Sequence, residues 1–359
     1  MKLYTCGHCH NPLYFENSTC LQCGYSVGFD PEKFRMITLG NRQGNTFSDM
    51  ADTQVTYKLC SNAQYGVCNW LIPSSQSEAF CIACSLNRTI PSLDDSENRA
   101  RWKNMEIAKH RIVYSLLHLN LPLHPKTPEH PEGLLFDFMA DPSPDEKIVT
   151  GHAEGVITIN LAEADEATRT STKADLGEKY RTLLGHFRHE VGHYYWERLQ
   201  AVPDFPPDFR ALFDDENKNY TDALNHYYET GAPANWMENY ISPYASAHPW
   251  EDWAETWAHY LHMMDTLETA YAFGIAIRPE QVRHVDLMKA QVKSDPYCID
   301  DFTRIIDLWL PLTFAVNSLN RSMGHTDFYP FIIYPEVIRK LAFIHASCTR
   351  LAGVASSPA

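Results

Sequence analysis

The sequence has none of the long apolar runs that mark a membrane or secreted protein. No stretch approaches the roughly 18 consecutive apolar residues with which a transmembrane helix begins. The amino terminus, Met1-Lys2-Leu3-Tyr4-Thr5-Cys6, has no apolar signal region behind its basic residue. We therefore expect a soluble cytoplasmic protein without a membrane partner, in which thiols stay reduced.

Positive charge is also scarce. The 359 residues include 30 Lys and Arg against 45 Asp and Glu, so the net charge is -15. Binding of nucleic acid across a general surface depends on Lys and Arg that contact phosphates, so nucleic acid is not an expected partner. Hydrophobic residues at 44% and charged residues at 21% are typical of a globular protein, and the length suits one large domain with a smaller module.

Cysteine is almost missing from the last three quarters of the chain. Only Cys298 and Cys348 follow residue 84, and as isolated thiols we expect both to be small buried apolar residues. The other eight cysteines form two clusters before residue 85. In a reducing compartment, such clusters indicate metal ligands rather than disulfides.

The first cluster consists of two Cys-x-x-Cys knuckles, Cys6 with Cys9 and Cys20 with Cys23. Each knuckle turns two sulfurs toward one point, so the pair predicts a zinc site with four thiolate ligands. A redox dithiol is the alternative, but two paired knuckles in one short segment favour zinc.

The second cluster has a looser spacing and consists of Cys60, Cys68, Cys81 and Cys84. We predict that these thiolates hold a second zinc ion. Two alternatives are that the clusters exchange ligands, or that His8 or His10 replaces a cysteine. Both predicted zinc sites are closed and structural, because four protein ligands leave no open position for a substrate.

Helical periodicity is weak over roughly the first 90 residues. We interpret residues 1–92 as a zinc-ribbon module with two cysteine sites, followed by a second domain over residues 93–352. Small zinc ribbons often bind protein or nucleic acid. Since this segment has no marked basic excess, protein contact or packing between domains is favoured.

Four secondary-structure elements of the second domain can be predicted. An apolar stripe at helical spacing predicts a helix from Arg99 to Leu121. The β-branched run Val156–Asn160 predicts a strand, which we place at the edge of a sheet. Further helices are expected over residues 176–200 and from Pro249 to about residue 271.

The predicted helix over residues 176–200 contains the run His189-Glu190-Val191-Gly192-His193. Positions i and i+4 share one face of a helix, so His189 and His193 can bind the same zinc ion. Glu190 lies next to the open coordination position, where it can accept a proton from zinc-bound water and return it to the leaving amine. His186, one turn earlier, is a candidate to line the cleft or to support a ligand.

A catalytic zinc needs a third protein ligand. Glu251 and Glu255 lie one helical turn apart in the segment from His248 to His259. One of these carboxylates can bind zinc while the other orients a ligand histidine. His259 and His262 are alternative third ligands.

This pattern resembles that of the gluzincin metallopeptidases. His189-Glu190-x-x-His193 is followed by Glu-x-x-Ala-Glu-x-Trp, which is similar to the motif of the anthrax lethal factor type. The resemblance implies that Glu251 is the third zinc ligand and that Glu255 orients a ligand. It also implies that Tyr244, seven residues before Glu251, stabilises the oxyanion, a task that suits a phenol donor.

Nearly the whole chain resembles a bacterial family of zinc-binding metallopeptidases with an amino-terminal zinc ribbon. The segments that carry this resemblance are Cys68-Asn69-Trp70-Leu71-Ile72-Pro73, Arg88-Thr89-Ile90-Pro91, the run from Gly185 to Trp196, and the run from His248 to His259. The resemblance implies the domain order and the class of reaction.

These features predict an α+β protein in which a zinc-ribbon module precedes a zincin-like, gluzincin metallopeptidase domain. One catalytic and two structural zinc ions are expected. A protein or peptide substrate would bind along the edge strand and be hydrolysed by zinc-bound water that Glu190 activates. Two other hypotheses are a repair protease that acts on protein–DNA crosslinks, which the net charge disfavours, and an inactive zinc-scaffolded interaction protein, which the intact ligands and base disfavour.

Overall fold

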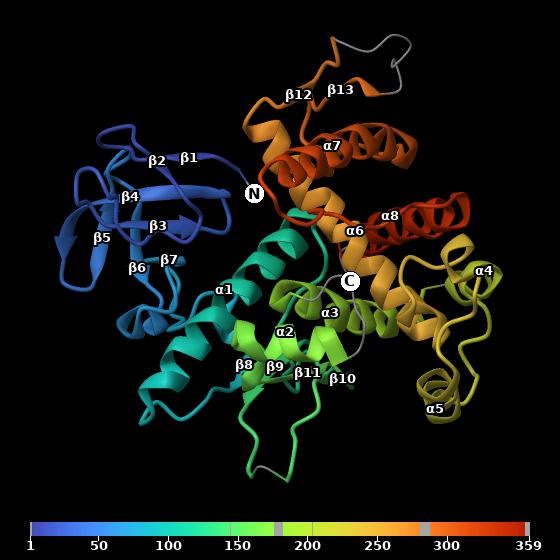
Figure 1. Ribbon diagram of the computed structural model, residues 1–359. Helices are drawn as coiled ribbons and strands as arrows, with labels where there is room; N and C mark the ends of the chain where they lie inside the picture. The colour runs from blue at the N-terminus through green and yellow to red at the C-terminus, as the bar shows by residue number, and fades with distance from the viewer. Residues whose placement is uncertain (1, 144, 176–181, 203, 281–287, 356–359) are drawn as a thin grey trace. The chain divides into compact units, whose positions relative to one another are not determined.

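The chain combines short strands near its amino terminus with long helices near its carboxyl terminus (Figure 1). The residues that the computed structural model describes are 2–143, 145–175, 182–202, 204–280 and 288–355. The chain divides into two compact units, residues 1–117 with 123–175 and residues 118–122 with 176–359. The domain boundary that the sequence suggests, between residues 92 and 93, stays a prediction.

An antiparallel sheet of five strands forms the first part of unit 1. Its strands follow one another in chain order as β3 (Val27–Asp30), β4 (Arg35–Gln43), β5 (Thr46–Asp49), β6 (Thr56–Leu59) and β7 (Leu71–Pro73). A hairpin of β1 (Tyr4–Thr5) and β2 (Pro12–Leu13) precedes this sheet. The short 3-10 helices η1 (Ser61–Tyr65) and η2 (Cys84–Leu86) follow β6 and β7.

Aromatic rings connect helix α1 (Ser96–His118) to this sheet. The ring centroids of Phe29 and Trp70 lie 5.0 Å apart, and Tyr114 of α1 approaches Phe15 at 5.4 Å. All four side chains are almost completely buried. Burial of such rings contributes about 1.5–3 kcal/mol each, so α1 is part of the core of unit 1.

Helix α1 ends earlier than its periodicity predicts. The sequence places its end at Leu121, but the helix ends at His118. Asn120 has a φ of 54°, which is the left-handed conformation that commonly terminates a helix. The apolar stripe is as expected, because Trp102, Met105 and Ile112 are fully buried.

The second sheet of unit 1 has the strand order β10–β11–β9–β8. Its strands are β8 (Asn87–Thr89), β9 (Leu135–Met139), β10 (Gly151–Ala153) and β11 (Val156–Asn160). Strands β8, β9 and β11 are parallel, whereas β10 is antiparallel to β11. After β11 come η3 (Leu161–Ala164) and helix α2 (Glu166–Asp175).

Strand β11 forms at the residues that the sequence predicts, but its expected place at the sheet edge is wrong. It lies between β10 and β9. Glu154 and Gly155 have φ values of 48° and 75°, so they form a two-residue hairpin turn that pairs β10 with β11. Because glutamate is not a typical residue for such a turn, the sequence gives little sign of this hairpin.

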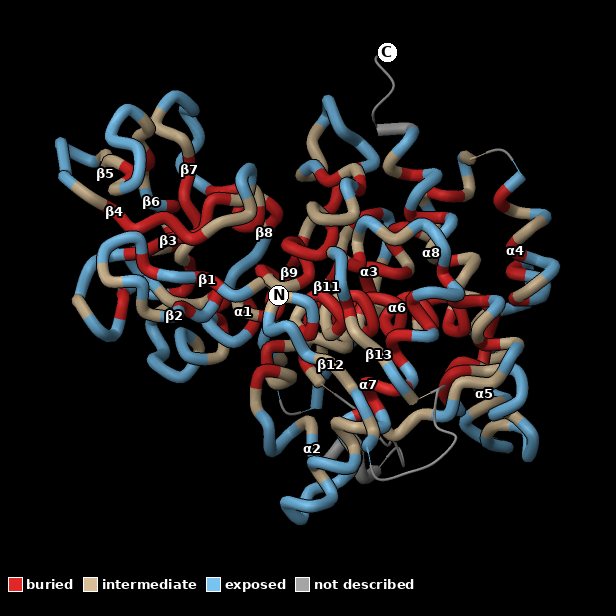
Figure 2. The backbone as a smooth tube through the Cα atoms, turned by 90° about the horizontal axis from the view of Figure 1, so that it is seen from above, coloured by how far each residue is buried: buried red, intermediate tan, exposed pale blue. Residues whose placement is uncertain are grey.

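Unit 2 is mainly helical. Its elements are α3 (Leu183–Leu199), α4 (Phe205–Phe213), α5 (Tyr220–Thr230), η4 (Trp236–Glu238), η5 (Tyr244–Ser246), α6 (Pro249–Ala272), β12 (Ala276–Ile277), β13 (Ala290–Gln291), η7 (Pro296–Cys298), α7 (Phe302–Ser322) and α8 (Pro335–Ala355). Helix α6 contacts α3, α4, α7 and α8, and Figure 2 shows how much of it is buried.

The local sequence explains why α6 starts where it does. His248 caps the helix by accepting a hydrogen bond from the Trp250 N–H through Nδ1, and Pro249 occupies the first helical position. Glu251 and Asp252 place negative charge in the first turn, where the helix dipole stabilises it. The observed span from Pro249 to Ala272 agrees with the predicted helix.

Helix α3 carries the His-Glu-x-x-His run, as predicted. It begins after Thr182, whose side chain caps the helix by accepting a hydrogen bond from the Gly185 N–H. The predicted start, over residues 176–181, lies outside the described residues. The helix ends at Leu199, one residue from the predicted end.

The two isolated cysteines differ from each other. Cys348 is buried in α8, as expected, but the prediction that Cys298 is buried is wrong. Cys298 ends the short helix η7, in which Pro296 is the residue that packs inward.

Among the described residues, no helix combines the length and the apolar character that crossing a membrane requires.

A buried ion pair between Lys340 and Asp252 joins α8 to α6. Lys340 Nζ donates to Asp252 Oδ2 and to the Asn239 carbonyl, each at 2.6 Å, and lies 4.5 Å from the centre of the Tyr240 ring. The Lys340 and Asp252 side chains are only 4% and 1% exposed. Removing the lysine would leave a buried carboxylate without its counter-charge.

We therefore expect Lys340→Met to lower the free energy of unfolding by about 3–5 kcal/mol. Chemical denaturation of the full chain measures this change. The matched control is Arg339→Ala on the same helix, because Arg339 is exposed and pairs with Glu336, so its loss should cost no more than about 0.5 kcal/mol. Equal effects of the two substitutions would contradict the assigned role of Lys340.

Candidate functional site

Helices α3 and α6 are in close contact at Gly192. A methyl group at this position would lie 3.1 Å from Ala254 Cα and 3.2 Å from Trp257 Cβ. Trp253 Nε1 donates a hydrogen bond of 2.8 Å to the Gly192 carbonyl. The lack of a side chain at Gly192 therefore allows polar groups of both helices to meet on either side of this contact.

Three of these polar groups converge on one point. His189 Nε2 lies 3.2 Å from His193 Nε2 and 3.0 Å from Glu251 Oε2. Glu251 Oε1 lies 3.7 Å from His193 Nε2. One donor atom from each residue lies within 4.8 Å of the other two, so the structure brings the two histidines and the first glutamate together as a group that can hold a metal ion.

The spacing of these atoms suits zinc. In a tetrahedral site with Zn–N bonds of about 2.0–2.1 Å, two histidine nitrogens lie about 3.3 Å apart. The observed separation of His189 and His193 is 3.2 Å. Two imidazole nitrogens and one carboxylate also leave a fourth position open, as in catalytic zinc sites.

Glu255 determines which nitrogen of His189 carries the proton. Its Oε1 lies 2.8 Å from His189 Nδ1, and because a carboxylate can only accept, Nδ1 donates and a neutral ring keeps its lone pair at Nε2. Ser242 Oγ donates to Glu255 Oε2 at 2.7 Å, and the Ala245 N–H donates to Ser242 Oγ at 3.1 Å. These bonds orient His189 Nε2 toward the other two donors.

The electrostatic field of this group attracts positive charge. Burial lowers the pKa of His189, but contacts with Glu251 and Glu255 outweigh burial and raise that pKa well above its ordinary value. Burial raises the pKa of Glu251, yet His193 and His189 lower it well below its ordinary value. Carboxylates that stabilise a proton on imidazole also stabilise a metal cation at the same place.

Glu190 lies on α3 next to His189 and is 8% exposed. It is not one of the donors that surround the common point. Among the described residues, no side chain or backbone group forms a hydrogen bond or ion pair with its carboxylate.

Two tyrosines lie beside the metal-binding group. The ring centroid of Tyr244 is 6.2 Å from that of His189. Tyr220, at the start of α5, donates a hydrogen bond of 2.6 Å to Glu251 Oε1. Burial raises the pKa of both phenols, and the charge of Glu251 raises them further, so both hydroxyls keep their protons. The family resemblance implies a role for Tyr244, but nothing in the sequence points to Tyr220, which lies 31 residues before Glu251 outside any motif.

The other candidate histidines do not join this group. His259 Nδ1 lies 2.7 Å from the Tyr329 hydroxyl, and His262 Nδ1 accepts a hydrogen bond of 2.9 Å from Arg188. Both are thus engaged away from the donors that His189 and His193 provide. His186 lies on α3 one turn before His189, half-buried, and its role stays a prediction.

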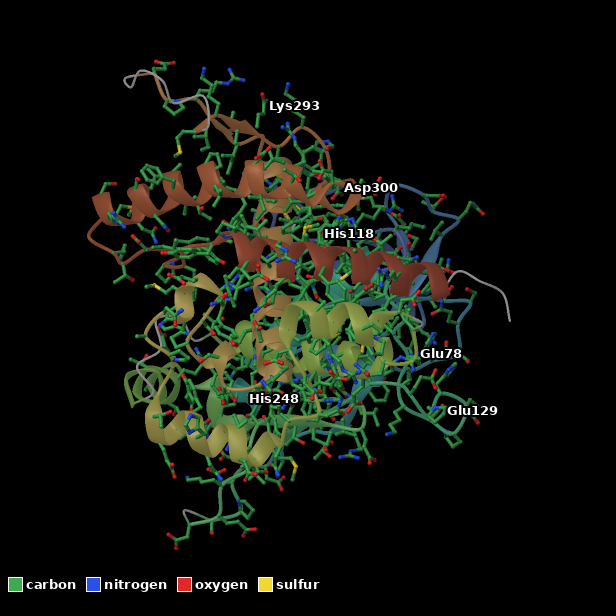
Figure 3. All side chains as sticks on the ribbon, turned by 90° about the vertical axis from the view of Figure 1, so that its right-hand side faces the viewer. Glu78, His118, Glu129, His248, Lys293 and Asp300 are labelled. Atoms are coloured by element: carbon green, nitrogen blue, oxygen red, sulfur yellow. The ribbon has the colours of Figure 1, made fainter. Side chains whose placement is uncertain are left out.

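A separate histidine, His118, also lies between carboxylates. Its Nδ1 is 3.2 Å from Glu268 Oε1 and its Nε2 is 3.4 Å from Asp295 Oδ2 (Figure 3 labels His118). Burial lowers the pKa of His118, but Asp295 and Glu268 raise it above its ordinary value. Because opposite ring nitrogens face the two carboxylates, this arrangement suits a protonated imidazole better than a ligand of a single metal ion.

The cysteines of unit 1 gather in the two predicted sets. The first set is Cys6, Cys9, Cys20 and Cys23, and the second is Cys60, Cys68, Cys81 and Cys84. Sulfur pairs within these sets lie 3.6 to 3.7 Å apart. Four thiolates around one zinc, with Zn–S bonds of about 2.3 Å, would lie about 3.8 Å apart, so both sets fit the ion.

Backbone amides and one unexpected histidine support these sulfurs. The N–H groups of His8 and Trp70 each lie 3.4 Å from a cysteine sulfur two residues earlier. Neither His8 nor His10 belongs to a donor group among the described residues. Instead His110 of α1 brings its Nε2 to 3.4 Å from Cys68 Sγ, while its Nδ1 donates to the Glu106 carbonyl. No cysteine spacing in the sequence points to this histidine.

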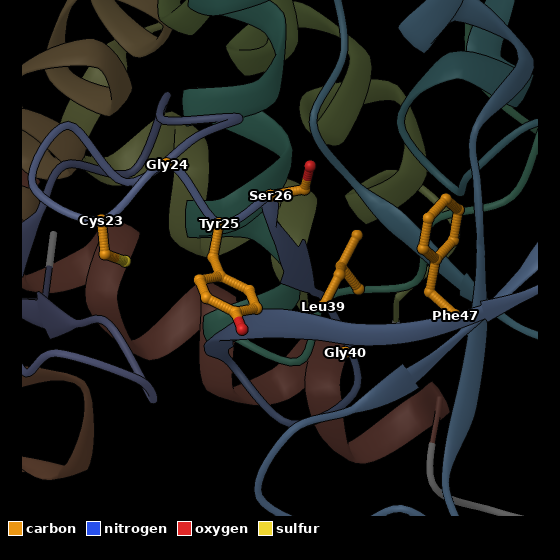
Figure 4. Close-up of a pocket in the computed structure, with 7 residues that line it drawn as sticks. All are labelled: Cys23, Gly24, Tyr25, Ser26, Leu39, Gly40 and Phe47. Atoms are coloured by element: carbon orange, nitrogen blue, oxygen red, sulfur yellow. The ribbon is translucent and has the colours of Figure 1, made fainter.

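An open pocket lies beside the first cysteine set in unit 1, because Cys23 is one of its lining residues (Figure 4). It is lined by Cys23, Gly24, Tyr25, Ser26, Leu39, Gly40 and Phe47. None of these residues belongs to the donor group on α3 and α6. The pocket therefore adds nothing to the chemistry of that group.

Comparison with known proteins agrees with the geometry. Residues 98–347 match the family described as "Putative zinc-binding metallo-peptidase", and residues 3–95 match a family described as a zinc-ribbon domain. Uncharacterized proteins from Mycobacterium bovis and Mycobacterium tuberculosis are 39% identical over 348 residues, which span 96% of this chain and 94% of theirs. No solved structure matches the chain. The chain therefore belongs to this family of zinc-binding metallopeptidases and carries a zinc-ribbon domain at its amino terminus, as its motifs predict.

Proposed function

We propose that this protein is a zinc-dependent peptidase that hydrolyses peptide bonds in a protein or peptide substrate. The observation that carries the proposal is the convergence of His189, His193 and Glu251 beside the uncommitted carboxylate of Glu190. The donor set suits a catalytic rather than a structural zinc, since three protein ligands leave one position open. Membership of a metallopeptidase family supports the same conclusion.

The residues of α3 and α6 would have different roles in hydrolysis. His189, His193 and Glu251 would hold the ion, and Glu255 would keep His189 in the tautomer that binds it. A zinc ion held there would acidify a coordinated water and polarise the substrate carbonyl. Glu190 would take the proton from the attacking water and later deliver it to the leaving amine.

Tyr244 is the proposed oxyanion donor. Its ring lies beside that of His189, and its raised pKa keeps the hydroxyl protonated as a hydrogen-bond donor. Among the described residues, no hydrogen bond engages this hydroxyl. The phenol is therefore able to donate to negative charge that develops on the carbonyl oxygen during attack.

The role of Glu190 is tested by Glu190→Gln, which retains the size of the side chain but cannot accept the proton. We expect hydrolysis to fall by about 10²- to 10⁴-fold while zinc content stays unchanged. A comparison of cleavage products across a whole proteome, between the native chain and the variant, measures the change without a known substrate. The matched control is Glu197→Gln, because Glu197 is an exposed residue later on α3.

If Glu190→Gln left the cleavage products unchanged while zinc remained bound, Glu190 would not be the base. If the native chain itself produced no cleavage products, the proposed peptidase function would be contradicted.

Metal content separates the enzyme from an inactive zinc scaffold. The enzyme requires about three zinc ions per chain, whereas a scaffold requires about two. One of the three would lie at each cysteine set and one between His189, His193 and Glu251, which we call the helical site. We expect His193→Ala to lose one ion and to keep the other two. Elemental analysis of purified protein measures the content, and Tyr329→Phe is a control outside the donor group. Equal zinc content of the native chain and His193→Ala would exclude the helical zinc site.

A further inference from the structure

Glu251 presents its two carboxylate oxygens to different partners. Oε2 lies 3.0 Å from His189 Nε2, on the side where the donor atoms converge. Oε1 accepts the hydrogen bond of 2.6 Å from the Tyr220 hydroxyl and lies 3.7 Å from His193 Nε2. The Glu251 side chain is only 1% exposed, so water cannot easily replace the phenol as the partner of Oε1.

We propose that Tyr220 is a positioning residue that holds Glu251 as a ligand through one oxygen only. The proposal rests on the metal site of the proposed function and extends it to a residue outside the metal-binding motifs. A carboxylate can bind a metal through one or both oxygens. A hydrogen bond from the phenol makes Oε1 a weaker donor to the ion, so Oε2 becomes the preferred ligand and the fourth coordination position stays open for water or substrate.

Residues around the start of α6 determine the position of Tyr220. His248 accepts the Trp250 N–H at Nδ1, so its Nε2 carries the proton and donates to the Lys218 carbonyl at 3.1 Å. The Tyr220 ring packs against the rings of His248 and Trp250, with centroids 5.2 Å and 5.6 Å apart (Figure 3 labels His248). The segment that leads into α5 is thus attached to the helix that carries Glu251.

The two tyrosines beside the metal-binding group differ in what their hydroxyls do. The Tyr220 hydroxyl is committed to Glu251, whereas that of Tyr244 makes no hydrogen bond within the described part of the chain. Loss of the first should therefore change metal binding, and loss of the second should change catalysis alone. Helix α5 has no fully buried residue, so removing one hydroxyl from its first position should not unfold the protein.

The test compares Tyr220→Phe with Tyr244→Phe in the full chain. We expect Tyr220→Phe to bind zinc at the helical site about 10- to 100-fold more weakly, because removing a hydrogen-bond partner of a metal ligand typically lowers metal affinity by that factor. Competition with a chelator measures the affinity. Comparison with His193→Ala, which is expected to lose only the ion at the helical site, shows which of the bound ions belongs to that site. Tyr244→Phe should retain native zinc affinity.

Cobalt substitution gives a second readout. With cobalt at the helical site, the visible spectrum of the native chain should be that of a four-coordinate ion, and Tyr220→Phe should shift it toward higher coordination as Oε1 becomes free to bind. Native zinc affinity together with a native cobalt spectrum in Tyr220→Phe would overturn the inference, even if cleavage were reduced. Weakened zinc binding in a chain without peptidase activity would uphold the inference and overturn only the proposed function.

Discussion

The close contact of α3 and α6 at Gly192 is the constraint on which the candidate site depends. Each helix contributes a pair of polar residues one turn apart, His189 with His193 and Glu251 with Glu255. These pairs meet because the glycine lets the two backbones approach, and a methyl group there would lie only 3.1 Å from Ala254. Trp253 reinforces the contact through its hydrogen bond to the Gly192 carbonyl. Gly192, which lies between His189 and His193, thus allows the two helices to bring these donors together.

The chain also separates two kinds of group that can hold a metal ion. In unit 1, sets of four cysteines form closed groups that suit structural zinc, in a module built of short strands. In unit 2, nitrogen and carboxylate donors leave one position open, and buried carboxylates on α6 supply the negative field. The two kinds of group also have different neighbours. Backbone amides approach the sulfurs, whereas Glu255 contacts His189 and Tyr220 donates a hydrogen bond to Glu251.

Much of this arrangement can be predicted from the sequence, because short local patterns encode it. Helical spacing places His189 and His193 on one face, and the paired glutamates of α6 repeat that spacing. The strand Val156–Asn160 is likewise evident from its β-branched residues. Its place in the sheet is not, because the turn at Glu154 and Gly155 lacks the typical residues of a hairpin.

The residues that the sequence does not reveal are those joined only by tertiary structure. Tyr220, Ser242 and His110 support their sites from separate segments, with no spacing that relates them to the ligands. Exposure is equally dependent on tertiary packing, as Cys298 shows by lying at the surface of a short 3-10 helix. Motifs therefore identify the candidate ligands, whereas the groups that contact and orient them emerge only from the fold.

A crystal structure of the zinc-loaded protein, measured at the zinc absorption edge, tests directly whether the donors of α3 and α6 hold zinc. We predict an anomalous peak about 2.0–2.2 Å from His189 Nε2, His193 Nε2 and one oxygen of Glu251, with Glu255 hydrogen-bonded to His189 rather than bound to the ion. A helical region without a zinc peak, or a zinc ion held by Glu255 in place of Glu251, would contradict this prediction.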